Sequence, residues 1–198
     1  MKITDKQVKG IISYILKNKT ELVEIADFFD YRDIENGIFK IPEKLVNTVV
    51  KSKVMKLNQV STYLKDYRIS FENGRLLADL RLDARQLGPV SAKYMIEILD
   101  MRFSPDSCRI YGTFDEDVRS MGNAMQGLAL KAAVSGSTAL QRLLKLTGCD
   151  FIFVDGRNIM IDLSNIEKVR KVAGFIELSY AGCSEGCLKL KFNYLGGR

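Results

Sequence analysis

The chain has 198 residues, of which 46% are hydrophobic and 27% are charged, and its formal net charge is +6. This composition excludes an intrinsically disordered protein, and the length allows one large domain or two small ones. No apolar run approaches the roughly 18 to 20 residues that a membrane-spanning helix needs, and residues 1–10 lack the apolar segment of a signal peptide. We therefore expect a cytoplasmic protein.

Residues 1–57 form the first predicted unit, a mainly helical segment that packs on the main domain. A capping-box sequence at 4–7 precedes a helical apolar stripe, and a second stripe runs over 20–29. The ENG sequence at 35–37 predicts a turn, and a short extended piece, IFKI, follows it. Pro42 suits the first turn of a third helix. The apolar face of that helix would consist of Leu45, Val46, Val49, Val50 and Val54.

Alternating apolar and polar residues define the second unit, 58–198, which we expect to form one integrated domain. The Asn-Gly pair at 73–74 is a strong hairpin signal between two such alternating strands. A third strand is expected over 91–103, with apolar residues on both faces. A fourth strand is expected over 108–114.

A long helix is predicted over 118–132, because apolar residues recur there at helical spacing. The acidic residues 115–117 would lie at its N-terminus, where negative charge is favourable. A break at 135–136 precedes further helical residues, and Gly148 is expected to end them. The residues that carry this helical pattern are Val118, Met121, Met125, Leu128 and Ala132.

A second hairpin signal, the Asp-Gly pair at 155–156, begins the last third of the chain. Ser164 and Glu167 have capping-box spacing and predict the start of a short basic helix. Two strands with clean alternation then follow, joined by a tight turn between Cys183 and Cys187.

The two hairpins share a sequence pattern. ISFENGRLLADLRL at 69–82 and FIFVDGRNIMIDL at 151–163 each contain an apolar run, an Asx-Gly-Arg turn and a second apolar run that includes Asp-Leu. In each case two further strands follow. The pattern leaves two readings open, a repeated four-stranded unit or two unrelated hairpins that happen to use a common turn.

Residues that carry chemistry are scarce. The sequence contains no histidine, which excludes Ser-His-Asp and Cys-His catalysis and removes the most common general base and metal ligand. The GNAMQG sequence at 122–127 lacks the Lys-Ser/Thr ending of a phosphate-binding loop. We predict no catalytic residue, no cofactor and no enzymatic activity.

The four cysteines predict no metal site either. Cys108 and Cys149 lie alone in apolar surroundings, as buried thiols often do. Cys183 and Cys187 would face each other across their turn, but a CxxxC sequence without further ligands is a poor zinc signature. Reduced structural thiols and a redox-labile pair both remain open for these two residues.

The expected fold class is α+β, with N-terminal helices followed by a curved antiparallel meander that packs against a long helix. IPEKLVNTVV at 41–50, the meander at 69–82 and the later apolar helix resemble the tubular lipid-binding superfamily, which includes the bactericidal/permeability-increasing proteins and small bacterial one-module relatives. The resemblance covers about residues 41–194. It implies a bent sheet wrapped around a helix, with acyl chains in the groove between them.

A lipid or another apolar ligand is therefore the first expected partner. The strand 91–103 has a second apolar face that an ordinary one-sided sheet does not need, and methionines on the predicted helix suit ligands of irregular shape. The alternative is that both faces of this strand are covered by helices in a filled core. The candidate ligand-binding residues are Met95, Leu99, Met101, Phe103, Met121, Met125 and Leu128.

The positive charge indicates an anionic partner. Five lysines surround the third predicted helix, with Glu43 among them. They would contact lipid headgroups or a membrane surface. A solvated helix face and binding to nucleic acid are the alternatives, although the chain has none of the usual nucleic-acid motifs. A protein–protein or nucleic-acid scaffold is thus the second expected function. The candidate anion-contacting residues are Lys40, Lys44, Lys51, Lys53 and Lys56.

Overall fold

The computed structural model describes residues 30–56, 58–84, 87–147 and 149–195. The helical stripes predicted at 4–7 and 20–29, and the helix end predicted at Gly148, lie outside the described residues. The turn predicted at 35–37 and the extended piece after it are confirmed.

A single antiparallel sheet dominates the described part of the chain, which confirms the α+β class. Its main path runs β1-β9-β8-β4-β5-β7-β6, and β3 and β2 extend it from β4. The strands are β1 (Ile38–Pro42), β2 (Leu64–Glu72), β3 (Arg75–Asp83), β4 (Pro89–Ser104), β5 (Ser107–Ser120), β6 (Ile152–Asp155), β7 (Asn158–Asp162), β8 (Ile176–Ser184) and β9 (Cys187–Tyr194).

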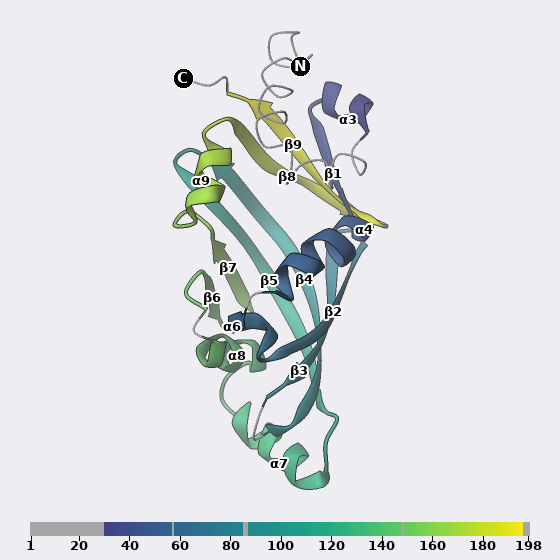
Figure 1. The fold of residues 1–198 in the computed structure, drawn as a ribbon, viewed down its shortest axis with the longest axis vertical. Helices are drawn as coiled ribbons and strands as arrows, with labels where there is room; N and C mark the ends of the chain where they lie inside the picture. The colour runs from purple at the N-terminus through teal and green to yellow at the C-terminus, as the bar shows by residue number, and fades with distance from the viewer. Residues whose placement is uncertain (1–29, 57, 85–86, 148, 196–198) are drawn as a thin grey trace.

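The helices are short. Residues 43–54 form one helical run, α4 (Glu43–Leu45), a π-helical stretch (Val46–Val50) and α5 (Lys51–Val54), which crosses in front of β4 and β5 in Figure 1. The other described helices are α3 (Tyr31–Glu35), α6 (Asn58–Ser61), α7 (Ala124–Ala133), α8 (Ala139–Thr147) and α9 (Glu167–Ala173). We call the side of the sheet on which the run 43–54 lies the inner face.

Both predicted hairpins are confirmed. β2 pairs with β3 around Asn73-Gly74, and β6 pairs with β7 around Asp155-Gly156. The glycines have φ values of +76° and +56°, a region that side-chain-bearing residues rarely adopt. The predicted third strand is also confirmed within β4.

The pairing of the strands does not repeat, although their order along the chain does. In the first half, β3 pairs with β4 and continues the meander. In the second half, β7 pairs with β5 while β8 pairs with β4, so the second pair of hairpins lies on either side of the β4–β5 hairpin. One edge of β4 is thus shared between β3, along 89–96, and β8, at Arg102 and Phe103.

The helix predicted over 118–132 is wrong at its start. β5 pairs with β4 as far as Ser120, and α7 begins only at Ala124. Val118 fits a period of two as well as a helical period, so the pattern was ambiguous there. The acidic residues of 115–117 consequently lie on a strand, where Asp115 pairs with Arg157 at 2.8 Å and Asp117 with Arg119 at 2.6 Å.

The start of the last helix also differs from its prediction. Ile166 is the N-cap of α9, and no side chain caps it. Ser164 serves another purpose, because its backbone N–H donates to the Asp162 carboxylate at 2.9 Å and its hydroxyl accepts from the Cys108 N–H at 3.1 Å. Ser164 thereby connects β7 to the start of β5.

The main core lies on the inner face, in the lower half of the molecule as drawn in Figure 1. The rings of Tyr94 and Phe114 pack there at a centroid distance of 6.1 Å. Leu130 brings α7 into the core, and Leu140 and Leu143 bring α8 against it. The buried members of this core cluster are Ala78, Leu82, Val90, Ala92, Tyr94, Phe114, Leu130 and Ile159.

Candidate functional site

A β-bulge in the centre of β4 decides which side chains reach the inner face. Ile98 pairs with Gly112, but Asp100 pairs with the adjacent Tyr111, so Leu99 is an extra residue. An extra residue reverses the alternation of side chains along the strand. Even-numbered residues therefore face inward up to the bulge, and odd-numbered residues face inward after it.

The bulge divides the predicted ligand-binding face of β4. Met95 and Leu99 lie on the outer face, where Leu99 is 60% exposed and Arg75 Nη1 lies 3.3 Å from Met95 Sδ. Met101 and Phe103 lie on the inner face, opposite Ile110 and the buried Cys108. The four residues predicted to form one face thus belong to two.

The helical half of the predicted cleft lies elsewhere. Met121 precedes α7 and is 68% exposed, and Met125 and Leu128 on α7 are 78% and 65% exposed. Helix α7 lies at the lower end of the molecule (Figure 1). The cleft predicted between 118–132 and the Met95–Phe103 face is therefore wrong, because the structure does not bring its two walls together.

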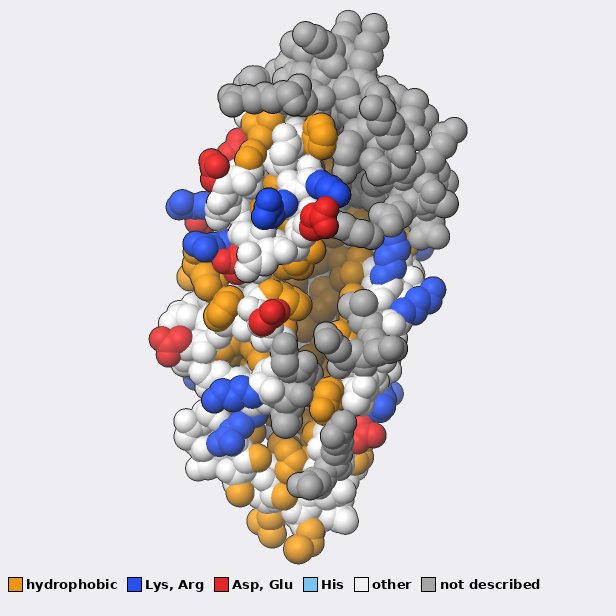
Figure 2. Space-filling view, turned by 60° about the vertical axis from the view of Figure 1, so that its left-hand side comes forward, with side chains coloured by type: hydrophobic (Ala, Val, Ile, Leu, Met, Phe, Trp, Pro, Cys, Tyr) orange, Lys and Arg blue, Asp and Glu red, His pale blue; other side chains and the backbone are white. Residues whose placement is uncertain are grey.

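An apolar hollow is present on the inner face nevertheless. Figure 2 shows apolar side chains gathered along a hollow that runs lengthwise over the middle of the molecule. In Figure 1, the run 43–54 lies over the sheet towards β2, and β6, β7 and α9 lie on the other side. Strand pairing places five apolar side chains of β4, β5 and β8 on the inner face beyond the core cluster. We call this part of the inner face the groove and its side chains the groove residues: Ile98, Met101, Phe103, Ile110 and Leu178.

The groove residues are incompletely buried. Met101 is buried, whereas the other four are only half-buried. They also lie outside the cluster that the described core residues form. Strand pairing positions them side by side, since Met101 is opposite Ile110 and Phe103 is opposite Leu178. The result is a continuous apolar surface contributed by three strands.

The helical wall of the groove is fixed to the edge of β2 by side chains. Asn47 hydrogen-bonds both backbone groups of Ile69, and Glu43 Oε1 accepts from the Phe71 N–H at 2.5 Å. The Tyr67 hydroxyl donates to the Val46 carbonyl at 3.2 Å. These bonds hold the run 43–54 at a set position over the sheet.

The predicted basic patch is partly neutralised. Lys40 Nζ lies 2.9 Å from the Asp33 carboxylate, whose hydrogen bond raises the pKa of Lys40. Lys51 Nζ lies 2.5 Å from Asp66 and 5.5 Å from the centre of the Tyr67 ring. The remaining three candidates, Lys44, Lys53 and Lys56, are exposed on or just after the run 43–54.

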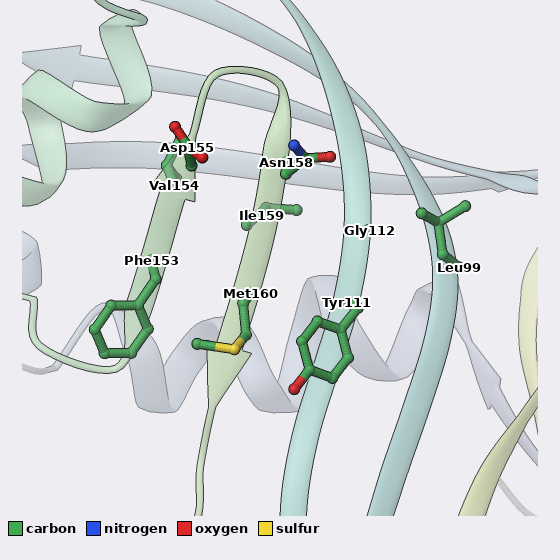
Figure 3. A pocket seen from close by; sticks show the side chains of 9 residues that line it. All are labelled: Leu99, Tyr111, Gly112, Phe153, Val154, Asp155, Asn158, Ile159 and Met160. Carbon is green, nitrogen blue, oxygen red and sulfur yellow. The ribbon is translucent and has the colours of Figure 1, made fainter.

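A second apolar site, which the sequence reasoning missed, lies on the outer face. Figure 3 shows Phe153, Met160 and Tyr111 in a row across β6, β7 and β5, with Leu99 of the bulge beyond them. They line an open pocket of about 400 Å³. The alternation in each strand was the available signal, but the order β4-β5-β7-β6 that aligns these residues was not readable from the sequence.

Two ion pairs lie beside this outer-face pocket, on strands that line it. Arg109 Nε lies 2.8 Å from Asp162, and Arg102 Nε lies 3.0 Å from Asp100. Two hydrogen bonds from Ser164 and the bond from Arg109 hold the pKa of Asp162 at about 2. The outer face is thus charged and solvated around a small apolar centre.

The cysteines of the last turn do not face each other. Cys183 is opposite Leu188, whereas Cys187 is opposite Ser184, and the Cys187 Sγ lies 3.3 Å from the Ser184 hydroxyl oxygen. All four cysteines are free thiols. Burial raises the pKa of Cys183 to about 11, which disfavours the reactive thiolate.

Among the residues that the structure describes, no three Cys, Asp or Glu side chains gather at a distance suitable for a metal ion. No described helix is long and apolar enough to cross a bilayer.

Comparison of the chain with family models, with curated proteins and with solved structures found no match. The candidate functional sites are the groove and the outer-face pocket.

Proposed function

We propose that this protein binds a lipid or another apolar ligand in the inner-face groove, without enzymatic activity. The observation that carries the proposal is the apolar hollow of Figure 2, together with the apolar inner-face side chains that pairing of β4, β5 and β8 brings together. Apolar clefts of this kind are common ligand sites, because they remove apolar ligand surface from water while a few polar groups set its orientation.

An acyl chain suits the groove in shape and energy. The groove residues form an extended apolar strip along three strands, and burial of an acyl chain contributes about 0.8 kcal/mol per methylene. Eight buried methylenes would thus contribute roughly 6 kcal/mol. The tubular lipid-binding resemblance implies the same arrangement, a ligand held between a bent sheet and a helix.

The exposed lysines beside the groove would hold the anionic headgroup of such a ligand. Lys53 and Lys56, both exposed, are the candidates, since Lys40 and Lys51 already have carboxylate partners. This contact is electrostatic and should weaken as the salt concentration rises. We further propose that the protein acts at the cytoplasmic surface of a membrane.

Native mass spectrometry of the purified protein, followed by solvent extraction, tests the proposal. We expect co-purified lipid, and we expect Ile98→Trp to reduce it by filling the groove. Leu99→Trp is the matched control, because Leu99 is the next residue but faces outward at the bulge. Protein without lipid that also fails to bind an added fluorescent fatty acid would contradict the proposal.

The alternative function is an interaction scaffold. The outer-face pocket favours it, because an exposed apolar centre with ion pairs beside it resembles the anatomy of a protein interface. In that case Leu99→Trp, and not Ile98→Trp, would abolish capture of a partner. The same pair of variants therefore separates the two functions.

A further inference from the structure

Helix α7 is apolar on the side that faces solvent as well as on the side that faces the core. Leu130 is 7% exposed and anchors the helix in the core cluster. Met125 and Leu128 protrude from the helix, and Met121 protrudes just before it. A surface helix of a soluble domain normally has one apolar stripe. The second apolar surface of α7 therefore needs an explanation.

The position of this apolar surface is fixed by the fold. Asn123 and Gln126 form a capping box, with the Gln126 N–H donating to Asn123 Oδ1 at 2.9 Å and the Asn123 N–H donating to Gln126 Oε1 at 3.1 Å. The Gln126 side chain also fills space that a Cβ on Gly88 would need. The Met121 N–H donates to the Pro89 carbonyl at 2.8 Å. These contacts present the protruding side chains in a defined arrangement.

The segment of the chain that contains α7 is basic. No acidic residue occurs in the sequence between Asp117 and Asp150, and Lys131 is the one charged residue of α7 itself. Asp117 is held by Arg119 through two hydrogen bonds, at 3.0 and 2.6 Å. Asp83, exposed at the end of β3, is an acidic residue at this end of the sheet. Figure 2 shows apolar side chains at the lowest part of the molecule, with several basic side chains and an acidic one above them.

We propose that the end of the molecule formed by Met121 and α7 docks onto an anionic lipid bilayer. Met121, Met125 and Leu128 would enter the boundary between headgroups and acyl chains, as the apolar face of an interfacial helix does. Lys131 would contact anionic headgroups, which attract basic residues near the surface. Docking at this end does not require that the groove holds a lipid, so it can be tested separately.

Flotation with vesicles tests the docking. The full-length protein is mixed with vesicles of phosphatidylcholine alone, or of phosphatidylcholine with phosphatidylglycerol. We expect binding to the mixed vesicles, and we expect the double variant Met125→Asp/Leu128→Asp to bind them about tenfold or more weakly. The matched control is Leu99→Asp, because Leu99 is 60% exposed, close to the 65% of Leu128, but lies on the outer face of the sheet. We expect this control to bind like the wild type.

Two further measurements keep the outcome unambiguous. A melting curve checks that each variant is folded, and Lys131→Glu tests the electrostatic contribution without removing an apolar side chain. Equal binding by the wild type and the double variant would overturn the proposal, and so would an equal loss in Leu99→Asp. Native mass spectrometry of the double variant should show the same lipid content as the wild type, so a failure of docking is distinguishable from a failure of groove binding.

Discussion

The carboxamide of Asn47 hydrogen-bonds both backbone polar groups of Ile69. Its Nδ2 donates to the Ile69 carbonyl at 2.6 Å, and its Oδ1 accepts from the Ile69 N–H at 2.8 Å. Asn47 thereby acts as a substitute for the next strand at the edge of β2. Gln141 of α8 makes a similar contact at the edge of β6, where its Nε2 donates to the Val154 carbonyl at 2.8 Å. Covered edges of this kind limit pairing with other chains.

Replacement of Asn47 by Ala should destabilise the protein by about 1 to 3 kcal/mol, because two partly buried backbone groups lose their partner. Urea unfolding provides the measurement. Thr48→Ala is the control, since the exposed Thr48 hydroxyl donates to the Lys44 carbonyl within the same helical run. A destabilisation in Thr48→Ala as large as that in Asn47→Ala would show that the bond to β2 is unimportant.

The sequence predicted the local elements of the sheet because their signals are local. The turns at 73–74 and 155–156 and the alternation of 91–103 each depend on a few consecutive residues. The failure at 118–132 has a physical reason: Val118 suits both periods, and pairing with Ala92 in β4 decides in favour of the strand. That pairing is a tertiary effect, which the local pattern does not contain.

The candidate site was harder to predict for the same reason. The prediction that the strand 91–103 has apolar residues on both faces was correct. The bulge at Leu99 was not predicted, however, and it moves Met101 and Phe103 to the opposite face from Met95. The order of the strands, which aligns Phe103 with Leu178, depends on contacts between residues far apart in the sequence.

Replacement of Gly74 or Gly156 by Val should destabilise the protein by about 1 to 2 kcal/mol or more, because both glycines have positive φ. A Cβ at either position would meet nothing within 4 Å, so the cost arises from the backbone and not from a collision. Asn tolerates positive φ better than Val. Thermal unfolding of the Gly→Asn variants should therefore show a smaller loss, and an equal loss would contradict the explanation.

Any side chain at position 112 should destabilise the protein. A Cβ there would lie 2.6 Å from the Glu97 carbonyl oxygen, which is part of the backbone beside the β4 bulge. We expect Gly112→Ala to cost about 1 to 3 kcal/mol in the free energy of unfolding. Gly127→Ala is the matched comparison, because it lies in α7 with its nearest neighbour at 3.9 Å. That change should stabilise the protein by up to about 1 kcal/mol.

Protonation of Asp162 should lower the stability of the folded protein at acidic pH. Its pKa is about 2 in the folded protein, below the ordinary value of 3.8, because Ser164 and Arg109 bind its charged form. The stabilisation that the charged Asp162 provides is fully present at a pH above its ordinary pKa of 3.8, and it is lost as the pH falls through about 2. We expect Asp162→Asn to flatten the decline in melting temperature between about pH 4 and pH 2. Asp106→Asn, in the exposed β4–β5 turn, is the control for the loss of a carboxylate without these partners.

The pairing of β1 with β9 has a consequence for synthesis on the ribosome. Ile41 is opposite Leu188, so β1 leaves the ribosome well before the strand that pairs with it. At ordinary elongation rates of about 5 to 20 residues per second, β1 must wait roughly 7 to 30 seconds with its strand edge unpaired. Nascent chains of this protein should therefore depend on chaperones until translation passes β9. Stalled chains should aggregate through the unpaired edge of β1.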